Sequence, residues 1–199
     1  MSWQRGAAGD GIRKIGAVLG FLAAVSLPAP PLSAAAAKFF SLQARAGYFI
    51  PADAIFRDIY GNGAAWGGEV DAALSPRLSL WAGVDYFSRD GLLPETRENT
   101  SIRVVPLQTG LKVGLDLGVA TRIYAGAGLA WFQYRESNSI ATLKQSGLGF
   151  VGRGGLLVYL GETFFLDFGG EYSTCRVEPA GVKADLGGYL ISAAAGFRF

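Results

Sequence analysis

The sequence contains no histidine and only one cysteine, Cys175. Without a histidine base, a serine or cysteine nucleophile lacks its usual activator. The histidine and cysteine clusters that bind transition metals are impossible for the same reason. The composition therefore predicts a protein that is not an enzyme and that carries no metal or other cofactor. It also predicts that Cys175 is an unreactive thiol; a reactive thiol beside Arg176 is the alternative.

Long hydrophobic runs are absent after residue 37, where no stretch approaches the 18 apolar residues that indicate a transmembrane helix. The apolar run at 15–27 is too short to span a bilayer, which takes about 20 residues. It follows a segment with three basic residues and precedes small residues at Ala35 and Ala37. This order is typical of a cleavable secretory signal peptide. We therefore predict a signal peptide over 1–37 and one mature domain over 38–199; an uncleaved anchor or tail is the alternative.

The mature segment also has no excess of positive or negative charge. Lysine and arginine number 18 and acidic residues 16 in the whole chain, and residues 1–37 hold three of the former and one of the latter. The segment 38–199 therefore has 15 of each and no net charge. Nothing in this balance favours nucleic acid as a partner.

Alternation of apolar and polar residues, the period of a β-strand, recurs eight times after residue 37. Most of these segments have about ten residues or slightly more, which suits a tilted strand that crosses a bilayer. Strands of soluble proteins usually have about 5–6 residues. The predicted strands are 40–50, 64–74, 78–87, 102–115, 121–134, 148–160, 164–175 and 188–199.

The connections between these strands alternate in length. The short ones lie at 75–77, 116–120 and 161–163, and the long polar ones at 51–63, 88–101, 135–147 and 176–187. Outer-membrane barrels have short periplasmic turns and long extracellular loops in this alternation. The pattern predicts an all-β, eight-stranded antiparallel up-and-down transmembrane β-barrel with both termini on the periplasmic side.

Each strand has an apolar face and a face with glycines and a few charges. In 164–175, for example, Phe164, Leu166 and Phe168 lie opposite Asp167 and Glu171. Because the charges are few and aromatic residues gather near the strand ends, we expect the charged faces to point into a membrane barrel. A soluble periplasmic lipocalin-like barrel, with the faces reversed, is the alternative. The predicted interior charges are Arg45, Glu69, Asp71, Asp85, Lys112, Arg153, Asp167 and Glu171.

The last strand ends on aromatic residues. Tyr189, Phe197 and Phe199 lie on one face and Gly196 on the other, and pairing with the first strand would close the sheet. These four residues resemble the C-terminal signal that the outer-membrane barrel-assembly machinery recognises. With the glycine-rich and aromatic stretch at 124–134, the mature chain resembles small eight-stranded outer-membrane barrels of the OmpA-domain, OmpX and OmpW type.

The resemblance implies a monomeric protein of the Gram-negative cell envelope, in contact with outer-membrane lipid. An eight-stranded barrel has an interior that side chains can fill. We expect a structural role, or surface interactions through the long loops; a narrow porin-like channel for small or hydrophobic solutes is the alternative. In the first long loop, Ile55, Phe56, Ile59 and Tyr60 recur at near-helical spacing, and this spacing predicts a short turn that caps the barrel mouth as a lid. An apolar loop packed on the rim is the alternative. Charged loop residues that could bind a surface partner are Arg57, Asp58, Arg89, Arg97, Glu98, Arg135, Glu136 and Lys144.

Overall fold

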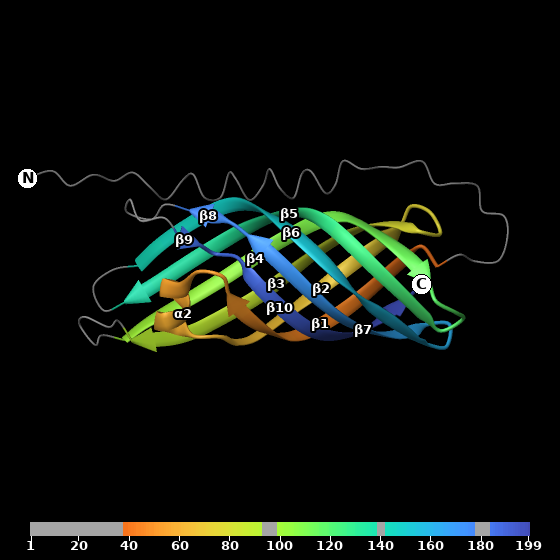
Figure 1. Ribbon diagram of the computed structural model, residues 1–199, viewed down its shortest axis with the longest axis horizontal. Helices are drawn as coiled ribbons and strands as arrows, with labels where there is room; N and C mark the ends of the chain where they lie inside the picture. The colour runs from red at the N-terminus through yellow and green to blue at the C-terminus, as the bar shows by residue number, and fades with distance from the viewer. Residues whose placement is uncertain (1–37, 93–98, 139–141, 178–183) are drawn as a thin grey trace, which may run out of the picture. The chain divides into compact units, whose positions relative to one another are not determined.

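The computed structural model describes residues 38–92, 99–138, 142–177 and 184–199 (Figure 1). The predicted signal peptide at 1–37 lies outside the described residues. The elements, in chain order, are β1 (Phe40–Pro51), α2 (Ala54–Tyr60), β2 (Gly63–Ala73), β3 (Leu78–Leu92), β4 (Asn99–Asp116), β5 (Thr121–Asn138), β6 (Thr142–Leu160), β7 (Phe164–Thr174), β8 (Arg176–Val177), β9 (Ala184–Asp185) and β10 (Gly188–Arg198).

Eight long strands form one closed antiparallel barrel in the order β1-β10-β7-β6-β5-β4-β3-β2. The first and last strands close it, with Leu42 opposite Phe197 and Tyr48 opposite Ile191. The backbone groups of Phe40 and Phe199 also bond to each other, at 3.1 and 2.9 Å. Both ends of the described domain therefore lie at the end of the barrel with the short turns, here called the short-turn end. The predicted eight-stranded all-β barrel is confirmed.

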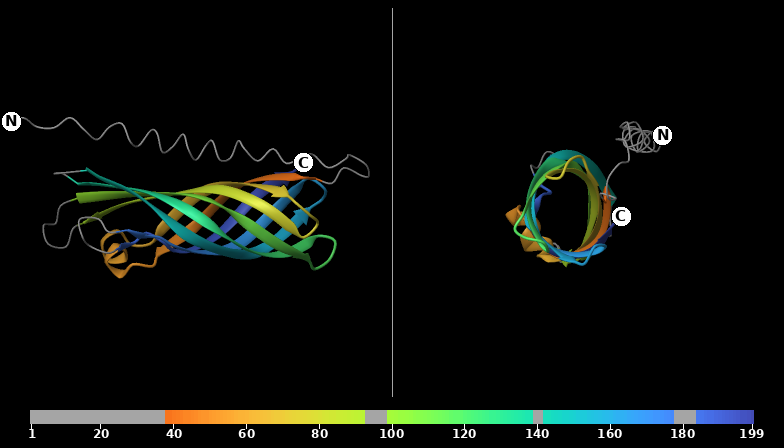
Figure 2. Two further views of the ribbon diagram at one scale, coloured as in Figure 1. Left: turned by 90° about the horizontal axis from the view of Figure 1, so that it is seen from above. Right: turned by 90° about the vertical axis from the view of Figure 1, so that its right-hand side faces the viewer.

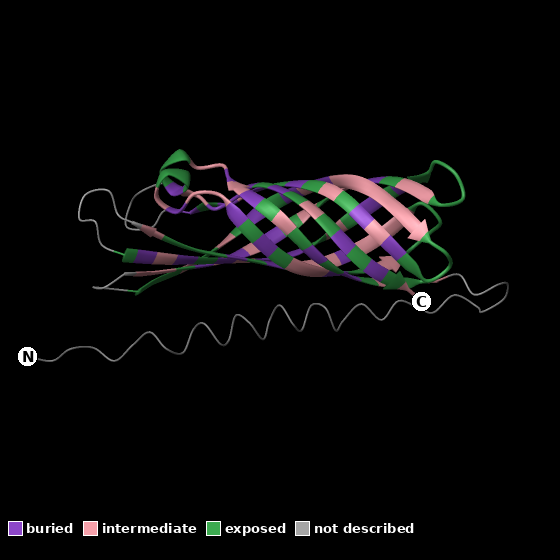
Figure 3. Ribbon diagram, turned by 90° about the horizontal axis from the view of Figure 1, so that it is seen from below, coloured by how far each residue is buried: buried purple, intermediate pink, exposed green. Residues whose placement is uncertain are grey.

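Side chains alternate between the two faces of every strand, as the two-residue period of a strand requires. In β10, Tyr189 and Ile191 are exposed on the outside, whereas Leu190 and Ala194 are buried inside. Exposed and buried positions alternate along the strands that face the viewer in Figure 3. The outer face is apolar over most of its height, and the inner face holds the charges.

Strands β3 to β6 are longer than predicted and project beyond the other strands at the opposite end, here called the long-loop end (Figure 2). The predicted loops at 88–101 and 135–147 are therefore largely strand, and the predicted first loop contains α2. The prediction failed here because the apolar alternation stops where the strands leave the apolar band. Backbone pairing continues beyond that point, for example between Arg103 and Arg135.

Candidate functional site

The eight predicted interior charges all lie on the inner face of the barrel. Seven of them are buried and Asp71 is partly buried. Three cations face five carboxylates, and each side chain comes from an inward-facing strand position. Buried charges need partners, because transfer out of water costs several kcal/mol without them. Together with Gln43, Gln108 and Tyr124, these eight residues are called the charge network below.

Arg45 lies at the centre of one half of the network. Its guanidinium donates to both oxygens of Asp85, at 3.1 and 2.8 Å, and reaches Glu171 at 3.5 Å. Gln108 completes this half by donating to Glu171 at 2.6 Å and to Asp85 at 3.2 Å. The side chain of Arg45 is 2% exposed, so this two-oxygen pairing with Asp85 is shielded from solvent.

Glu69 is the centre of the other half. It accepts hydrogen bonds from Lys112 and Arg153, and from Gln43 at 3.0 Å. Lys112 also bonds to Asp71 at 2.7 Å. The side chain of Glu69 is completely inaccessible to solvent. Two cations therefore share one buried carboxylate, and Arg153 has no other ion-pair partner among the described residues.

Uncharged residues that the sequence prediction omitted complete the network. Gln43 donates to Asp167 at 3.2 Å, and the Tyr124 hydroxyl lies 3.0 Å from both oxygens of that carboxylate. The guanidinium of Arg153 lies 4.6 Å from the centre of the buried Trp81 ring. All these residues occupy inward positions by strand alternation. Strand alternation was therefore the signal available in the sequence. It does not distinguish an inward-facing residue that joins the network from one that only fills space.

An apolar plug fills the barrel on the long-loop side of the charge network. It is built from inward-facing residues of several strands, including Phe49 and Phe87, whose ring centres are 5.0 Å apart. The cavity left between the plug and the network has a volume of only about 20 Å³. The described plug residues are Phe49, Ala65, Phe87, Ile102, Val104, Ala130, Phe132, Val151 and Leu190.

Helix α2 covers the plug. Asp53 accepts a hydrogen bond from the Phe56 amide at 3.0 Å and begins the helix, and Gly61, with φ of 69°, ends it. Phe56 packs against the plug, 6.4 Å from the Phe87 ring centre. The predicted lid residues divide into two groups: Phe56 and Tyr60 are buried and Ile59 is half-buried, whereas Ile55 is 65% exposed.

Tyr60 ties the end of α2 to the projecting strands. Its hydroxyl donates to Glu136 at 2.6 Å and lies 3.1 Å from the Thr100 hydroxyl. Tyr134 donates to the other oxygen of Glu136. Burial, and then the hydrogen bond to Glu136, raise the pKa of Tyr60 far above its usual value. Tyr60 therefore remains a neutral donor at physiological pH, and its hydrogen bond to the Glu136 carboxylate holds α2 in place.

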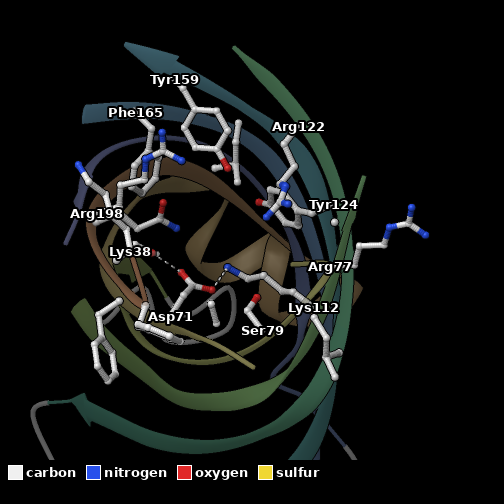
Figure 4. A pocket seen from close by; sticks show the side chains of 18 of the residues that line it. Lys38, Asp71, Arg77, Ser79, Lys112, Arg122, Tyr124, Tyr159, Phe165 and Arg198 are labelled. Carbon is white, nitrogen blue, oxygen red and sulfur yellow. Dashed lines mark hydrogen bonds and ion pairs between the residues drawn. The ribbon is translucent and has the colours of Figure 1, made fainter. Parts of the chain in front are cut away.

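The short-turn end contains a cavity of about 130 Å³ (Figure 4). Its cations are largely engaged by the chain itself. Arg198 donates to the Glu162 carbonyl at 2.8 Å and stacks on Tyr159 at 4.1 Å, and Lys38 donates to the Thr163 hydroxyl at 3.0 Å. Arg122 pairs with Asp116 at 2.7 Å. The cavity leads down to Asp71 and Lys112 of the charge network.

Cys175 lies at the long-loop end, after β7, and is 1% exposed. Burial, and the nearby Asp185 carboxylate, raise the pKa of this thiol to about 11. The thiolate is the reactive form, so Cys175 is poorly suited to act as a nucleophile at neutral pH. Among the described residues no group of three potential metal ligands occurs.

The four residues of the proposed C-terminal signal lie on both faces of the barrel wall. Tyr189, Phe197 and Phe199 are exposed on the outside, and Gly196 is buried on the inside. A Cβ atom at Gly196 would lie 2.5 Å from the Phe165 ring and 2.6 Å from the Leu42 carbonyl oxygen. Glycine is therefore required where β10 closes against β1.

The charged loop residues spread over several elements, and Arg97 and Glu98 lie outside the described residues. Arg57 and Asp58 are exposed on α2, while Glu136 points inward to Tyr60. Arg135 and Lys144 are exposed on β5 and β6 and lie opposite each other. None of the described helices is long and apolar enough to cross a membrane.

Comparisons with known proteins identify the fold. A scan against protein-family models finds no match, and a search of the curated proteins finds no similar sequence. The structure is similar to Neisserial surface protein A (NspA), with a TM-score of 0.63 and 14% identity over 80% of this chain and 97% of that one.

Two further structures are similar. One is Ail, the attachment invasion locus protein of Yersinia pestis in complex with the heparin analogue sucrose octasulfate, with a TM-score of 0.51 and 14% identity over 81% of this chain and 99% of that one. The other is a major outer membrane protein from Thermus thermophilus, with a TM-score of 0.50 and 16% identity over 80% of this chain and 98% of that one. The chain has the fold of the small eight-stranded outer-membrane β-barrels.

Proposed function

We propose that the protein is a monomeric integral protein of the bacterial outer membrane, with a closed barrel as its anchor and a surface-interaction role at its long-loop end. It has no catalytic activity in this proposal, and its termini face the periplasm. Its partners are outer-membrane lipid and, during biogenesis, the barrel-assembly machinery. The observation that carries the proposal is the inverted polarity of the barrel.

The inverted polarity is visible in single strands. On β6, Leu148 and Phe150 are each 69% exposed on the outer face, while Arg153 is 8% exposed inside. Leaving such large apolar side chains in water is unfavourable by about 1.5–3 kcal/mol each. A soluble lipocalin-like barrel would place these residues in its core. A bilayer removes the cost, and membrane barrels have this arrangement of faces.

The closed interior weighs against the channel alternative. Along the barrel axis, the charge network, the apolar plug and helix α2 follow one another. The cavity between network and plug, of about 20 Å³, has room for roughly one water molecule. These layers support a closed barrel that anchors the protein in the membrane and does not conduct ions or solutes.

The projecting strands support the surface-interaction role. Strands β3 to β6 carry polar and charged residues well beyond the apolar band. Among the similar structures, one protein is named a surface protein and another was solved with a polysulfated sugar. A role at the cell surface, through the same end of the barrel, is the corresponding proposal for this chain.

The first test is heat-modifiability. Envelope and soluble fractions of cells that express the protein are run on a denaturing gel, with and without boiling. We expect the protein only in the envelope fraction, with a band that shifts on boiling because the barrel resists detergent. A protein that remains in the soluble periplasmic fraction without a shift would contradict the proposal and favour the lipocalin-like alternative.

A further inference from the structure

Three cations meet on the outer face of the projecting strands. Arg103 of β4 lies directly opposite Arg135 of β5, and Arg135 lies directly opposite Lys144 of β6. All three side chains are exposed and lie at outward-facing positions of adjacent strands. These three residues are called the cation row below.

The cation row is unfavourable for the barrel on its own. Like charges directly opposite each other on neighbouring strands are destabilising. Among the described residues, no carboxylate forms an ion pair with any of the three, including Asp90 on the neighbouring strand β3. The guanidinium of Arg103 instead lies 5.5 Å from the centre of the Tyr86 ring. A row of cations in fixed register, without an ion-pair partner in the described part of the chain, calls for an anion with several negative groups.

The position of the row indicates which anion. Four residues nearer the barrel centre on the same three strands, the outward positions are Leu107, Trp131 and Leu148. On strands tilted by about 40° with a rise of about 3.3 Å per residue, the row lies about 10 Å above these apolar side chains. An apolar wall below and cations above match the acyl chains and the charged headgroup of a lipid.

We propose that the cation row binds the phosphate groups of a polyanionic lipid of the outer leaflet, while its acyl chains lie against Trp131 and Leu148. The inference rests on the proposed membrane location and deepens it by naming the ligand class. Lipid is favoured over a soluble anion because the row lies above an apolar wall on the same three strands, which a soluble anion would not use.

The test uses the native protein in phosphatidylcholine vesicles, with and without lipid A, a glycolipid with two phosphate groups. The readout is the temperature at which the heat-modifiable band is lost. We expect lipid A to raise this temperature. Since each cation near an anionic surface contributes about a fivefold factor, the triple variant Arg103→Gln, Arg135→Gln, Lys144→Gln should need on the order of a hundredfold more lipid A for the same rise.

The matched control is the triple variant Arg57→Gln, Arg89→Gln, Arg176→Gln, which removes the same charge from the same end outside the row. It should respond to lipid A as the native protein does. A second variant, Lys144→Glu, places opposite charges across from each other at Arg135. It should be at least as stable as the native protein in phosphatidylcholine alone, and should respond less to lipid A.

The outcomes separate the two proposals. If the native protein gives no heat-modifiable band in vesicles, the proposed function itself fails. If the band forms but the row and control variants respond equally to lipid A, the membrane location stands and the row proposal is overturned. Inorganic phosphate, added to phosphatidylcholine vesicles at the same phosphate concentration, should have no effect. An equal rise with inorganic phosphate would overturn the assignment to a lipid.

Discussion

Glu69 is the residue on which the barrel interior depends most directly. It is the only carboxylate that pairs with Arg153 among the described residues, and it shares Lys112 with Asp71. Its side chain has no contact with solvent. Removing one partner of a buried ion pair leaves the other charge uncompensated, which costs more than the pair itself contributes.

Glu69→Gln should therefore lower the free energy of unfolding by about 3–5 kcal/mol. The measurement is urea unfolding in phosphatidylcholine vesicles, followed by tryptophan fluorescence. The control is Asp116→Asn, which removes an exposed ion pair with Arg122 and should cost no more than about 1 kcal/mol. Equal losses in the two variants would show that the interior network contributes no more than a surface pair.

Residue positions inside the barrel followed from sequence, but their pairings did not. Strand alternation alone places Arg45 and Asp85 on the inner face. That they meet depends on the barrel: the two residues come from β1 and β3, which are not neighbouring strands. Closure and tilt bring them together across the interior, and no local pattern in the sequence encodes that distance.

At the scale of elements, the segments that cross the apolar band were the predictable ones. Their alternation and the short turns located all eight strands, because the outer face of a strand must be apolar where it crosses the apolar band. The extensions of β3 to β6 lack this constraint and were assigned to loops. For α2 the near-helical spacing predicted no more than a short turn acting as a lid, because seven residues carry too little periodicity to define a helix.

The closing strand β10 gives the element-scale prediction. Gly196→Ala should hinder the pairing of β10 with β1, because the added Cβ would approach the Leu42 carbonyl oxygen to 2.6 Å. We expect a weaker heat-modifiable band and a lower temperature for its loss. Gly152→Ala on β6 is the control, since a Cβ there has no neighbour within 4 Å. Wild-type behaviour of Gly196→Ala would contradict the tight closure.

At the scale of the whole molecule, the barrel contains layers of different chemistry along its axis. The short-turn end opens into a cavity of about 130 Å³, the charge network lies below it, and the apolar plug and α2 close the long-loop end. Either the network or the plug alone would obstruct an ion. The charged side chains of the network are already paired with one another, and the apolar plug leaves no water to hydrate an ion. Helix α2 is therefore the outermost of several barriers.

This order predicts the result of a conductance experiment. The native protein, inserted into planar bilayers and shown to be folded by the heat-dependent gel shift of the same preparation, should give no conductance steps. Replacing 53–61 with a glycine-serine linker removes α2 but leaves Phe49, Phe87 and the charge network in place. This variant should also be silent, because the remaining layers still fill the barrel. Steps in the native protein would contradict the closed barrel. Steps only after removal of α2 would identify the helix as a gate, and would favour the route for small or hydrophobic solutes over a purely structural anchor.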